Sequence, residues 1–372
     1  MDLSIVVPTY NERENVVIVA EAIRNCTLDY NIEVIFVDDS TDISSIDTLN
    51  KLKLNYNWVR VEHRENERGL GSAVVKGFEL AQGQYIAVMD ADMQHPPEIL
   101  VNMLKRIKIG EYDIVIPSRF IPGGNDGGLS GFRKIVSWTA RIIAQLLLKR
   151  VRKVTDPTSG FFLFRRTVID GVKLHPIGWK ILIEILVRGN YKSVLEIPYH
   201  FKPRINGQSN MSLKVQWKYI CHLALLLRDS PEDRRFYLFC LVGASGVILN
   251  QIIYISLLHL KLNVIVSSII AAGLVLISNF LLNDRFTWND SLASHKAKRF
   301  LRFAAISLIG IAINEAVLAS LVYFLGVHYI LGNLTGIAIA TLWNFIINHK
   351  VTWQMNRSIN GHFKEQTYEK IQ

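Results

Sequence analysis

Two acidic residues separated by a single residue follow an apolar run in the N-terminal half of the sequence. Asp90 and Asp92 come directly after "YIAVM", residues 85–89, and Gln94 lies two positions further on. Carboxylate and amide oxygens placed this close together in the chain suit a hard divalent cation, Mg²⁺ or Mn²⁺. A lone pair of acids at this spacing is commonly a solvated turn, so the metal interpretation depends on what else lies beside it.

Two other apolar runs within the first 120 residues also end in polar clusters, "PTYNE" at 8–12 and "DDS" at 38–40. The runs alternate with stretches of helical spacing, which predicts strands of a parallel α/β sheet joined by helices. In such sheets ligands bind at the carboxyl ends of the strands. The three clusters are therefore expected to meet at one edge of the sheet and to form a site.

A glycine-rich phosphate loop of the Walker or Rossmann type is not part of this pattern. "ERGLGSA", residues 67–73, contains Gly69 and Gly71 but lacks the third glycine of a dinucleotide fingerprint. If the ligand carries phosphates, a metal ion and basic side chains must hold them.

The composition narrows the class of partner. The chain has 372 residues, a formal net charge of +10 and three scattered cysteines. The cysteine spacing fits neither zinc nor a disulfide framework, which favours a reducing compartment. We expect phosphates and anionic lipid rather than nucleic acid as partners, because no nucleic-acid-binding motif occurs. The N-terminus has no signal peptide pattern, and nothing indicates an obligate protein partner.

The C-terminal third contains four long apolar segments, at 236–258, 264–283, 300–325 and 329–348. Each is near the roughly 20 residues that cross a bilayer as a helix. Basic residues gather before the first segment, between the second and third, and after the fourth. By the positive-inside rule, we expect a multi-pass protein of the cell membrane whose termini and N-terminal domain are cytoplasmic.

These four segments form an internal repeat. "RRFYLFCLVGASGVILN" (234–250) aligns with "KRFLRFAAISLIGIAIN" (298–314), and "SNFLLNDRFTW" (278–288) aligns with "WNFIINHKVTW" (343–353). The asparagines that recur are predicted to bond between helices rather than to line a transport path: Asn250, Asn279, Asn283, Asn314, Asn344 and Asn348. For Glu315, the one acid well inside a span, functional and packing roles both stay open.

Two further stretches, 133–151 and 212–228, combine apolar stripes with tryptophan and basic residues. This pattern predicts amphipathic helices that lie on the headgroup layer of a membrane. Packing of the same stripes on the sheet or on the membrane spans is the alternative.

The motifs of residues 1–210 resemble the family 2 glycosyltransferases with the GT-A fold, and within them the dolichol-phosphate mannose synthases. The resemblance lies in "IVVPTYNE", "VIFVDDS", "GLGSAVVKGFELAQGQYIAVMDADMQHPPE", "DPTSGFFLFRR" and "PIGWKILIEILVRG". The repeated "NF..N…TW" pattern is similar to the GtrA-like membrane proteins. Together they imply an α/β domain with a mostly parallel sheet, followed by an all-α four-helix transmembrane domain. The expected boundaries are 1–210, a linking amphipathic helix at 211–232, a membrane domain at 233–356 and a tail at 357–372.

The resemblance also implies a reaction and the residues that perform it. Mannose would pass from GDP-mannose to dolichyl or another polyprenyl phosphate, with inversion and with Mg²⁺ or Mn²⁺. The guanosine would be held by Pro8, Tyr10, Glu12, Val37 and Asp39; the diphosphate would border Asp90, Ala91 and Asp92; the metal would bind Asp92 and Gln94. Lys180 and Arg204 would serve the donor, and Arg119, Arg133 and Ser137 the acceptor phosphate, so that the expected catalytic set is Asp92, Arg119, Arg133, Lys180 and Arg204.

A phosphate acceptor changes what the site must do. Its oxygen is already anionic at neutral pH, so it needs no strong general base. It needs cations that hold two phosphates close together without quenching the nucleophile. We therefore interpret His95 as structural, or as a neighbour of the acceptor phosphate, rather than as a base.

Two other functions remain open at this point. One is a polyprenyl-phosphate glucosyltransferase that uses UDP-glucose, because the fold and the paired acids would be shared. The other is a flippase for lipid-linked sugars whose N-terminal domain only binds. The intact acids and the set of basic residues argue against a domain that has lost catalysis.

Overall fold

The computed structural model describes residues 1–127, 131–203, 213–289, 291, 295–353 and 367–370. The chain forms two compact units. The first holds Met1–Asp229 and the short C-terminal strand Thr367–Lys370, and the second begins at Ser230 and holds four long helices.

The first unit is an α/β domain built on one sheet. Its strand order is β3-β2-β1-β4-β6-β5-β7-β8. The strands are β1 (Leu3–Thr9), β2 (Ile32–Asp38), β3 (Val59–His63), β4 (Tyr85–Val88), β5 (Ile114–Ser118), β6 (Phe162–Arg165), β7 (Ser193–Pro198) and β8 (Thr367–Lys370). The helices are α1 (Arg13–Cys26), α2 (Ile43–Asn55), α3 (Leu70–Leu80), α4 (Glu98–Ile109), α5 (Gly131–Leu147), α6 (Ile181–Arg188) and α7 (Leu213–Asp229), with 3₁₀ turns at Lys149–Val151 and Arg166–Val168.

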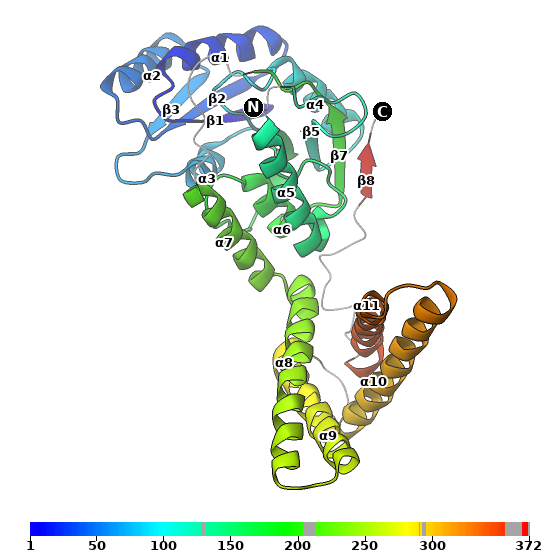
Figure 1. Ribbon diagram of the computed structural model, residues 1–372. Helices are drawn as coiled ribbons and strands as arrows, with labels where there is room; N and C mark the ends of the chain where they lie inside the picture. Colours follow the sequence, from blue (N-terminus) through cyan, green and yellow to red (C-terminus); the bar gives the residue numbers. More distant parts are fainter. Residues whose placement is uncertain (128–130, 204–212, 290, 292–294, 354–366, 371–372) are drawn as a thin grey trace. The chain divides into compact units, whose positions relative to one another are not determined.

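Helices cover both faces of this sheet (Figure 1). Successive side chains of a strand point to opposite faces, so β1 places Ile5 in one core and Val6 in the other. The core that contains Ile5 includes residues of α1, α2 and α4, and the core that contains Val6 includes residues of α3, α5, α6 and α7. Burial on both faces explains why β1 and β2 are continuous apolar runs rather than alternating ones.

The order of the strands brings the predicted polar clusters together. β1 lies between β2 and β4 and is parallel to both, and Thr9 at the end of β1 pairs with Asp38 at the end of β2. The chain after β1, β2 and β4 therefore emerges at one edge, where the strand order reverses, which is the usual ligand position in such sheets. The predicted fold class is confirmed, with one addition: β6 is antiparallel to β4 and to β5.

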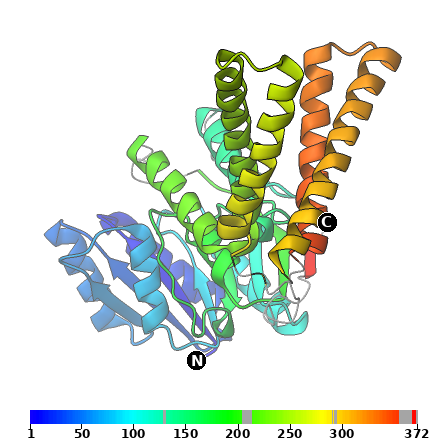
Figure 2. The same ribbon diagram turned by 90° about the horizontal axis from the view of Figure 1, so that it is seen from below.

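The second unit consists of four helices that are long and apolar enough to cross a membrane. These are α8 (Pro231–His259), α9 (Val264–Leu282), α10 (Lys296–Ala319) and α11 (Tyr329–Ile347). The last three continue into π-helical turns at Asn283–Thr287, Ser320–Phe324 and Asn348–Thr352. Each of the four apolar segments expected from the sequence forms a helix, and Figure 2 shows them as two hairpins, α8 with α9 and α10 with α11.

An aromatic cluster joins the two hairpins, and its members are counterparts in the repeat. The rings of Trp288 and Trp353 stack with centroids 4.0 Å apart and planes 7° apart. Trp353 Nε1 donates to Asp284 Oδ1 at 3.0 Å, and Trp288 Nε1 donates to His349 Nδ1 at 3.3 Å. Each copy thus supplies the acceptor for the tryptophan of the other copy. The remaining buried members are Phe280 and Phe303, with Phe239, Phe300 and Phe345 packed against them.

Two of the repeated asparagines, Asn279 and Asn344, lie where the helices of each hairpin approach closely. Asn279 packs against Gly246 and Asn344 against Gly310, where an added Cβ would lie 2.6 and 2.5 Å from an amide atom. Glycine is therefore needed at both places for the helices of a hairpin to approach each other. Within the described part of the chain, Oδ1 of both asparagines has no hydrogen-bond partner, so the expected interhelical bonds do not form at these atoms.

Candidate active site

A cavity of about 920 Å³ opens where the chain leaves β1, β2 and β4. Its wall comes from the ends of these strands, the start of α3, the segment between β6 and α6, and the helices α5 and α7. Most of the residues predicted from the sequence line it: Pro8, Tyr10, Glu12, Asp39, Asp90, Ala91, Asp92, Gln94, Arg119, Ser137 and Lys180.

Three predicted residues are not among them. The side chain of Val37 is fully buried in the core together with Val6 and Ile35, so it does not reach the cavity. Arg133 lies in the first turn of α5, but its side chain is outside the described residues, and Arg204 is outside them altogether.

The segment after β4 gathers oxygen atoms at the cavity wall. Met93 has a positive φ of 59°, and this turn brings the backbone N–H of Gln94 to Asp92 Oδ1 at 3.1 Å. The Gln94 Nε2 donates to the carbonyl of Lys202 at 3.1 Å, which orients its amide. Asp90 Oδ2 lies within hydrogen-bond distance of His95 Nε2, at 3.3 Å. The carboxylates and the amide oxygen therefore belong to one short, turned segment.

This set of donors fits a divalent cation that is shared with a ligand. No three His, Cys, Asp or Glu side chains of the described residues form a cluster that would hold a metal alone. Mg²⁺ is usually bound by one or two protein oxygens together with substrate phosphates and water. Asp92 and Gln94 supply hard oxygens of that kind beside Asp90 in the cavity.

Asp39 is fixed at the other end of the cavity by the start of α3. Arg64 donates to both of its oxygens at 2.7 Å, and Gly69 N donates at 2.9 Å. Gly69 has a φ of +148°, a conformation that other residues rarely adopt. The buried ion pair and this glycine hold the Asp39 end of the cavity in place before any ligand binds.

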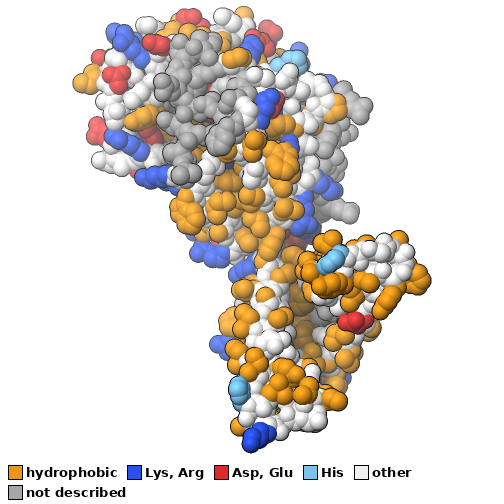
Figure 3. Space-filling view, viewed as in Figure 1, with side chains coloured by type: hydrophobic (Ala, Val, Ile, Leu, Met, Phe, Trp, Pro, Cys, Tyr) orange, Lys and Arg blue, Asp and Glu red, His pale blue; other side chains and the backbone are white. Residues whose placement is uncertain are grey.

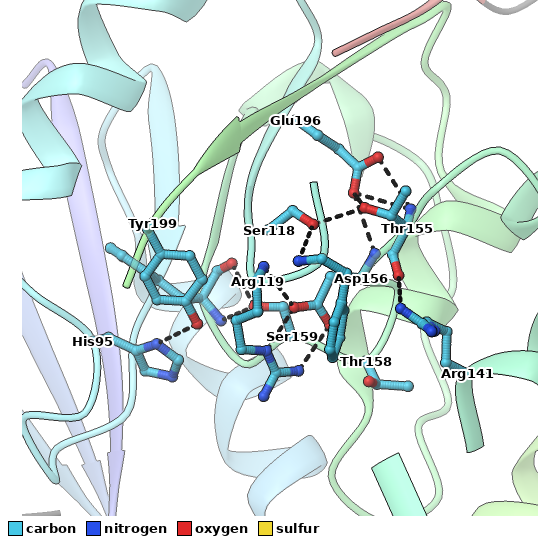
Figure 4. Close-up of polar contacts among 12 residues, drawn as sticks. His95, Ser118, Arg119, Arg141, Thr155, Asp156, Thr158, Ser159, Glu196 and Tyr199 are labelled. Carbon is cyan, nitrogen blue, oxygen red and sulfur yellow. Dashed lines mark hydrogen bonds and ion pairs between the residues drawn. The ribbon is translucent and has the colours of Figure 1, made fainter. Parts of the chain in front are cut away.

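The side chain of Arg119, which is 9% exposed, is paired with the carboxylate of Asp156 (Figure 4). Its Nε and Nη2 donate to the two oxygens of Asp156 at 2.7 and 2.8 Å. Burial alone would lower the pKa of Arg119, but the charge and hydrogen bonds of Asp156 outweigh it and raise the pKa above its ordinary value. Arg119 is therefore a permanent positive charge at the cavity wall.

Asp156 is held in turn by Glu196 of β7. Glu196 accepts hydrogen bonds from Thr155 N at 3.0 Å, Thr155 Oγ1 at 2.6 Å and Asp156 N at 3.2 Å. Burial, and then the nearby Asp156 charge, raise the pKa of Glu196. Neither acid is among the site residues predicted from the sequence. A signal existed for both: Asp156 opens the "DPTSG" motif, and Glu196 is a single acid within an apolar strand.

Lys180 is the second cation of this wall. Its Nζ donates to the carbonyl of Thr158 at 2.6 Å and lies 3.5 Å from the ring centroid of Trp179. Burial, and then the neighbouring Arg119, lower the pKa of Lys180 to about 7. Its charge therefore changes near neutral pH.

Comparison of the sequence with known proteins identifies the family of the chain. Residues 4–172 match the model of glycosyl transferase family 2, and residues 238–353 match the GtrA/DPMS transmembrane domain. A dolichol-phosphate mannosyltransferase of Pyrococcus furiosus is 37% identical over 353 residues, which are 95% of this chain and 99% of the relative. The chain belongs to the dolichol-phosphate mannosyltransferase family.

A second relative and a solved structure each cover about three fifths of the chain. A dolichol-phosphate mannosyltransferase of Saccharomyces cerevisiae is 33% identical over 235 residues, covering 60% of this chain and 86% of the relative. A glucosyl-3-phosphoglycerate synthase of Mycobacterium tuberculosis covers 62% of this chain and 80% of its own, at 18% identity and a TM-score of 0.47. The dolichol-phosphate mannosyltransferase family relationship makes the chain a glycosyltransferase with a multi-pass membrane domain.

His95 is packed among aromatic side chains beside the cavity. It is 4% exposed, and its ring centroid lies 5.1 Å from Phe161 and 5.4 Å from Phe201. The Tyr199 hydroxyl lies 3.3 Å from its Nδ1 (Figure 4). Both ring nitrogens thus have neighbours, with Asp90 on the other side, and this setting suits a positioning role for His95.

The two amphipathic stretches form α5 and α7, and the packing alternative holds for one face of each helix. Their inner faces pack in the core through side chains such as Ala144 and Leu223. Their outer faces expose large apolar side chains, of which Trp138 is 55% and Trp217 is 68% exposed. Figure 3 shows hydrophobic side chains gathered over this part of the first unit.

Proposed function

We propose that this chain transfers mannose from GDP-mannose to dolichyl or another polyprenyl phosphate, with inversion at the sugar carbon. The observation that carries the proposal is one cavity that is lined both by oxygen ligands, Asp90, Asp92 and Gln94, and by two cations, Arg119 and Lys180. Such a cavity suits a reaction in which a diphosphate leaves and a phosphate attacks. The curated relatives, named dolichol-phosphate mannosyltransferases, favour mannose and dolichyl phosphate as partners.

The nucleoside would lie at the end of the cavity that Asp39 and the start of α3 hold rigid. Pro8, Tyr10 and Glu12 line the same end. Val37, which the family resemblance also suggests, could contribute only its backbone, because its side chain is in the core. The diphosphate would border Asp90, Ala91 and Asp92.

A divalent cation, Mg²⁺ or Mn²⁺, fits Asp92 and Gln94, and when bound it would offset the negative charge that develops on the leaving diphosphate. Asp90 and His95 orient this segment through their contact. Lys180, and by family resemblance Arg204, would bind the donor diphosphate.

The acceptor phosphate would be bound by Arg119, Ser137 and, by family resemblance, Arg133. One of its oxygens attacks the sugar carbon while the bond from that carbon to the diphosphate breaks, and GDP leaves with the electron pair. The acceptor oxygen is already anionic, so no proton has to be removed. Arg119 suits this step, because its pairing with Asp156 keeps it charged and prevents it from donating a proton to the nucleophile.

The lipid reaches this site from the membrane surface. The exposed apolar side chains of α5 and α7 would enter the headgroup layer, and both helices line the cavity through residues such as Ser137 and Tyr219. By the positive-inside rule, the basic residues that flank the apolar helices favour a cytoplasmic side for both termini and the catalytic domain.

A donor comparison tests the proposal directly. The full-length protein in lipid vesicles is incubated with polyprenyl phosphate and either labelled GDP-mannose or labelled UDP-glucose, and the lipid fraction is counted. We expect label from GDP-mannose, and product analysis should give a β-linked mannose. Label from UDP-glucose alone would contradict the proposal and favour the glucosyltransferase alternative.

A further inference from the structure

Two hydrogen-bonding groups of the cavity wall are shielded from solvent and unpaired. Thr158, which is 2% exposed, and Trp179 both line the cavity. Within the residues that the structure describes, neither the hydroxyl of Thr158 nor the indole N–H of Trp179 has a hydrogen-bond partner. Buried polar groups are nearly always paired in native proteins, so each exception calls for an explanation.

Both residues contact Lys180, but not through their free hydrogen-bonding groups. Lys180 Nζ donates to the backbone carbonyl of Thr158 at 2.6 Å and lies 3.5 Å from the ring centroid of Trp179. The Thr158 hydroxyl and the Trp179 N–H are therefore the groups that Lys180 does not use. Figure 4 shows Thr158 beside Asp156, with no contact drawn to its hydroxyl.

The segment that carries Thr158 lies against the carboxylate wall. A Cβ added to Gly160 would be 2.8 Å from Asp90 Oδ2, so the backbone two residues after Thr158 touches that acid. Asp156, two residues before Thr158, binds Arg119. Thr158 thus lies in the chain between a residue that touches Asp90 and one that binds Arg119, and we expect the transferred sugar between the diphosphate and the acceptor phosphate that these two groups would serve.

The chemistry of the two groups matches a neutral hydroxyl better than a phosphate. An indole N–H only donates, whereas a threonine hydroxyl both donates and accepts. The phosphates already have Arg119 and Lys180 as charged partners. A hexose brings several hydroxyls that can accept from Trp179 and exchange a hydrogen bond with Thr158.

We propose that Thr158 and Trp179 form the subsite that binds hydroxyl groups of the transferred hexose, and that they help to select the sugar. This inference rests on the proposed function, because it assumes a nucleotide-sugar donor in the cavity. A site that hydrogen-bonds a hydroxyl rejects analogues without it much more strongly than an apolar pocket would.

Variants that remove one hydrogen-bonding group each, combined with deoxy donors, test this subsite in the full-length protein. Thr158→Val keeps the shape of the side chain and removes the hydroxyl, and Trp179→Phe keeps a smaller aromatic ring and removes the N–H. For the wild type we expect kcat/KM to fall roughly 10- to 100-fold when the donor is a monodeoxy GDP-mannose that lacks the contacted hydroxyl. In the variant that lacks the partner of that hydroxyl, the ratio of kcat/KM between GDP-mannose and the deoxy donor should be about threefold or less, because the variant cannot form the hydrogen bond with either donor.

Matched controls separate this role from a structural one. Thr48→Val and Trp58→Phe make the same chemical changes outside the cavity and should keep the wild-type donor preference. Thr158→Ser keeps a hydroxyl and should restore the preference. All variants should bind GDP as the wild type does, since GDP lacks the sugar, and this binding also reports that the protein is folded.

Two results would overturn the inference. One is that both variants discriminate against every deoxy donor as strongly as the wild type does. The other is that they raise the KM of the polyprenyl phosphate while donor discrimination is unchanged, which would assign the groups to the acceptor phosphate. A wild type that uses another nucleotide sugar would refute the proposed donor instead, and deoxy forms of that donor would then test the same subsite.

Discussion

Burial lowers the pKa of both cations of the cavity, but only Arg119 is paired with a carboxylate, and this pairing reverses the net shift. Arg119 is bonded to both oxygens of Asp156, and its pKa lies above the ordinary value because this pairing outweighs burial. Lys180 donates to a neutral carbonyl, and burial lowers its pKa to about 7. The site therefore combines a permanent charge with one that depends on pH.

The first prediction concerns the charge of Lys180. Below pH 7 Lys180 of the free protein is protonated and attracts a diphosphate; above pH 7 it is neutral, and the ligand must bind together with a proton. The affinity for GDP should therefore fall about tenfold between pH 6 and pH 8, which is the change in the protonated fraction of a group with a pKa near 7. Isothermal titration calorimetry measures it, and Lys180→Arg should remove the dependence. An unchanged pH dependence in that variant would assign the effect to another group.

The second prediction concerns the partner of Arg119. Asp156→Asn leaves a buried guanidinium without its counter-charge, which should lower the free energy of unfolding by about 3–5 kcal/mol and strongly reduce sugar transfer. Thermal or denaturant unfolding of the full-length protein measures the first effect. The exposed pair of Lys76 and Glu79, 3.4 Å apart, is the matched control, and Glu79→Gln should cost less than about 1 kcal/mol. Equal losses in both variants would contradict the special role of the buried pair.

At the scale of elements, sequence patterns predicted the strands that end at the site but not the contacts that complete it. β1, β2 and β4 are short apolar runs followed by polar residues, and both signals are local. The antiparallel insertion of β6 and the packing of α7 on α6 depend on contacts between distant segments. In the latter, His222 Nε2 lies 2.6 Å from Glu184 Oε2, and both side chains are fully buried. No periodicity in either segment indicates that pair.

Distance along the chain also explains which site residues could be predicted from the sequence. Asp90, Asp92 and Gln94 are close together in the chain, so their spacing carries information. The pairing of Arg119 with Asp156 joins a residue directly after β5 to one before β6, and Glu196 of β7 binds the Asp156 backbone. Such long-range pairing follows only from the order of the strands in the sheet.

The third prediction concerns the exposed faces of α5 and α7. Replacing Trp138 and Trp217 by serine should raise the KM for a long-chain polyprenyl phosphate in vesicles, about tenfold or more, because two interfacial side chains are lost. GDP binding and the KM for a short, water-soluble acceptor should not change. Leu54→Ser, at a side chain of α2 that is 85% exposed, is the control. An equal loss with both acceptors would show that these tryptophans support the cavity rather than the approach to the membrane.

At the scale of the whole molecule, the sequence predicted two domains of different chemistry and the repeat within the second. It did not predict that the copies exchange contacts, with Trp353 donating to Asp284 and Trp288 to His349. The counterparts Asp284 and His349 differ in type, so no matching motif indicates the pairing. The membrane domain of this dolichol-phosphate mannosyltransferase family member is thus a pseudo-symmetric pair of hairpins, joined by the stacked tryptophans.

The central claim is that the segment after β4 holds the cation that serves the leaving GDP, while the acceptor arrives from the membrane already charged. The most direct measurement is transfer of labelled mannose from GDP-mannose to polyprenyl phosphate by the full-length protein in lipid vesicles, comparing the wild type with Asp92→Ala. We predict metal-dependent transfer by the wild type and a loss of about a hundredfold or more in the variant, with the unfolding temperature nearly unchanged. A folded Asp92→Ala protein that transfers mannose at close to the wild-type rate would contradict the account.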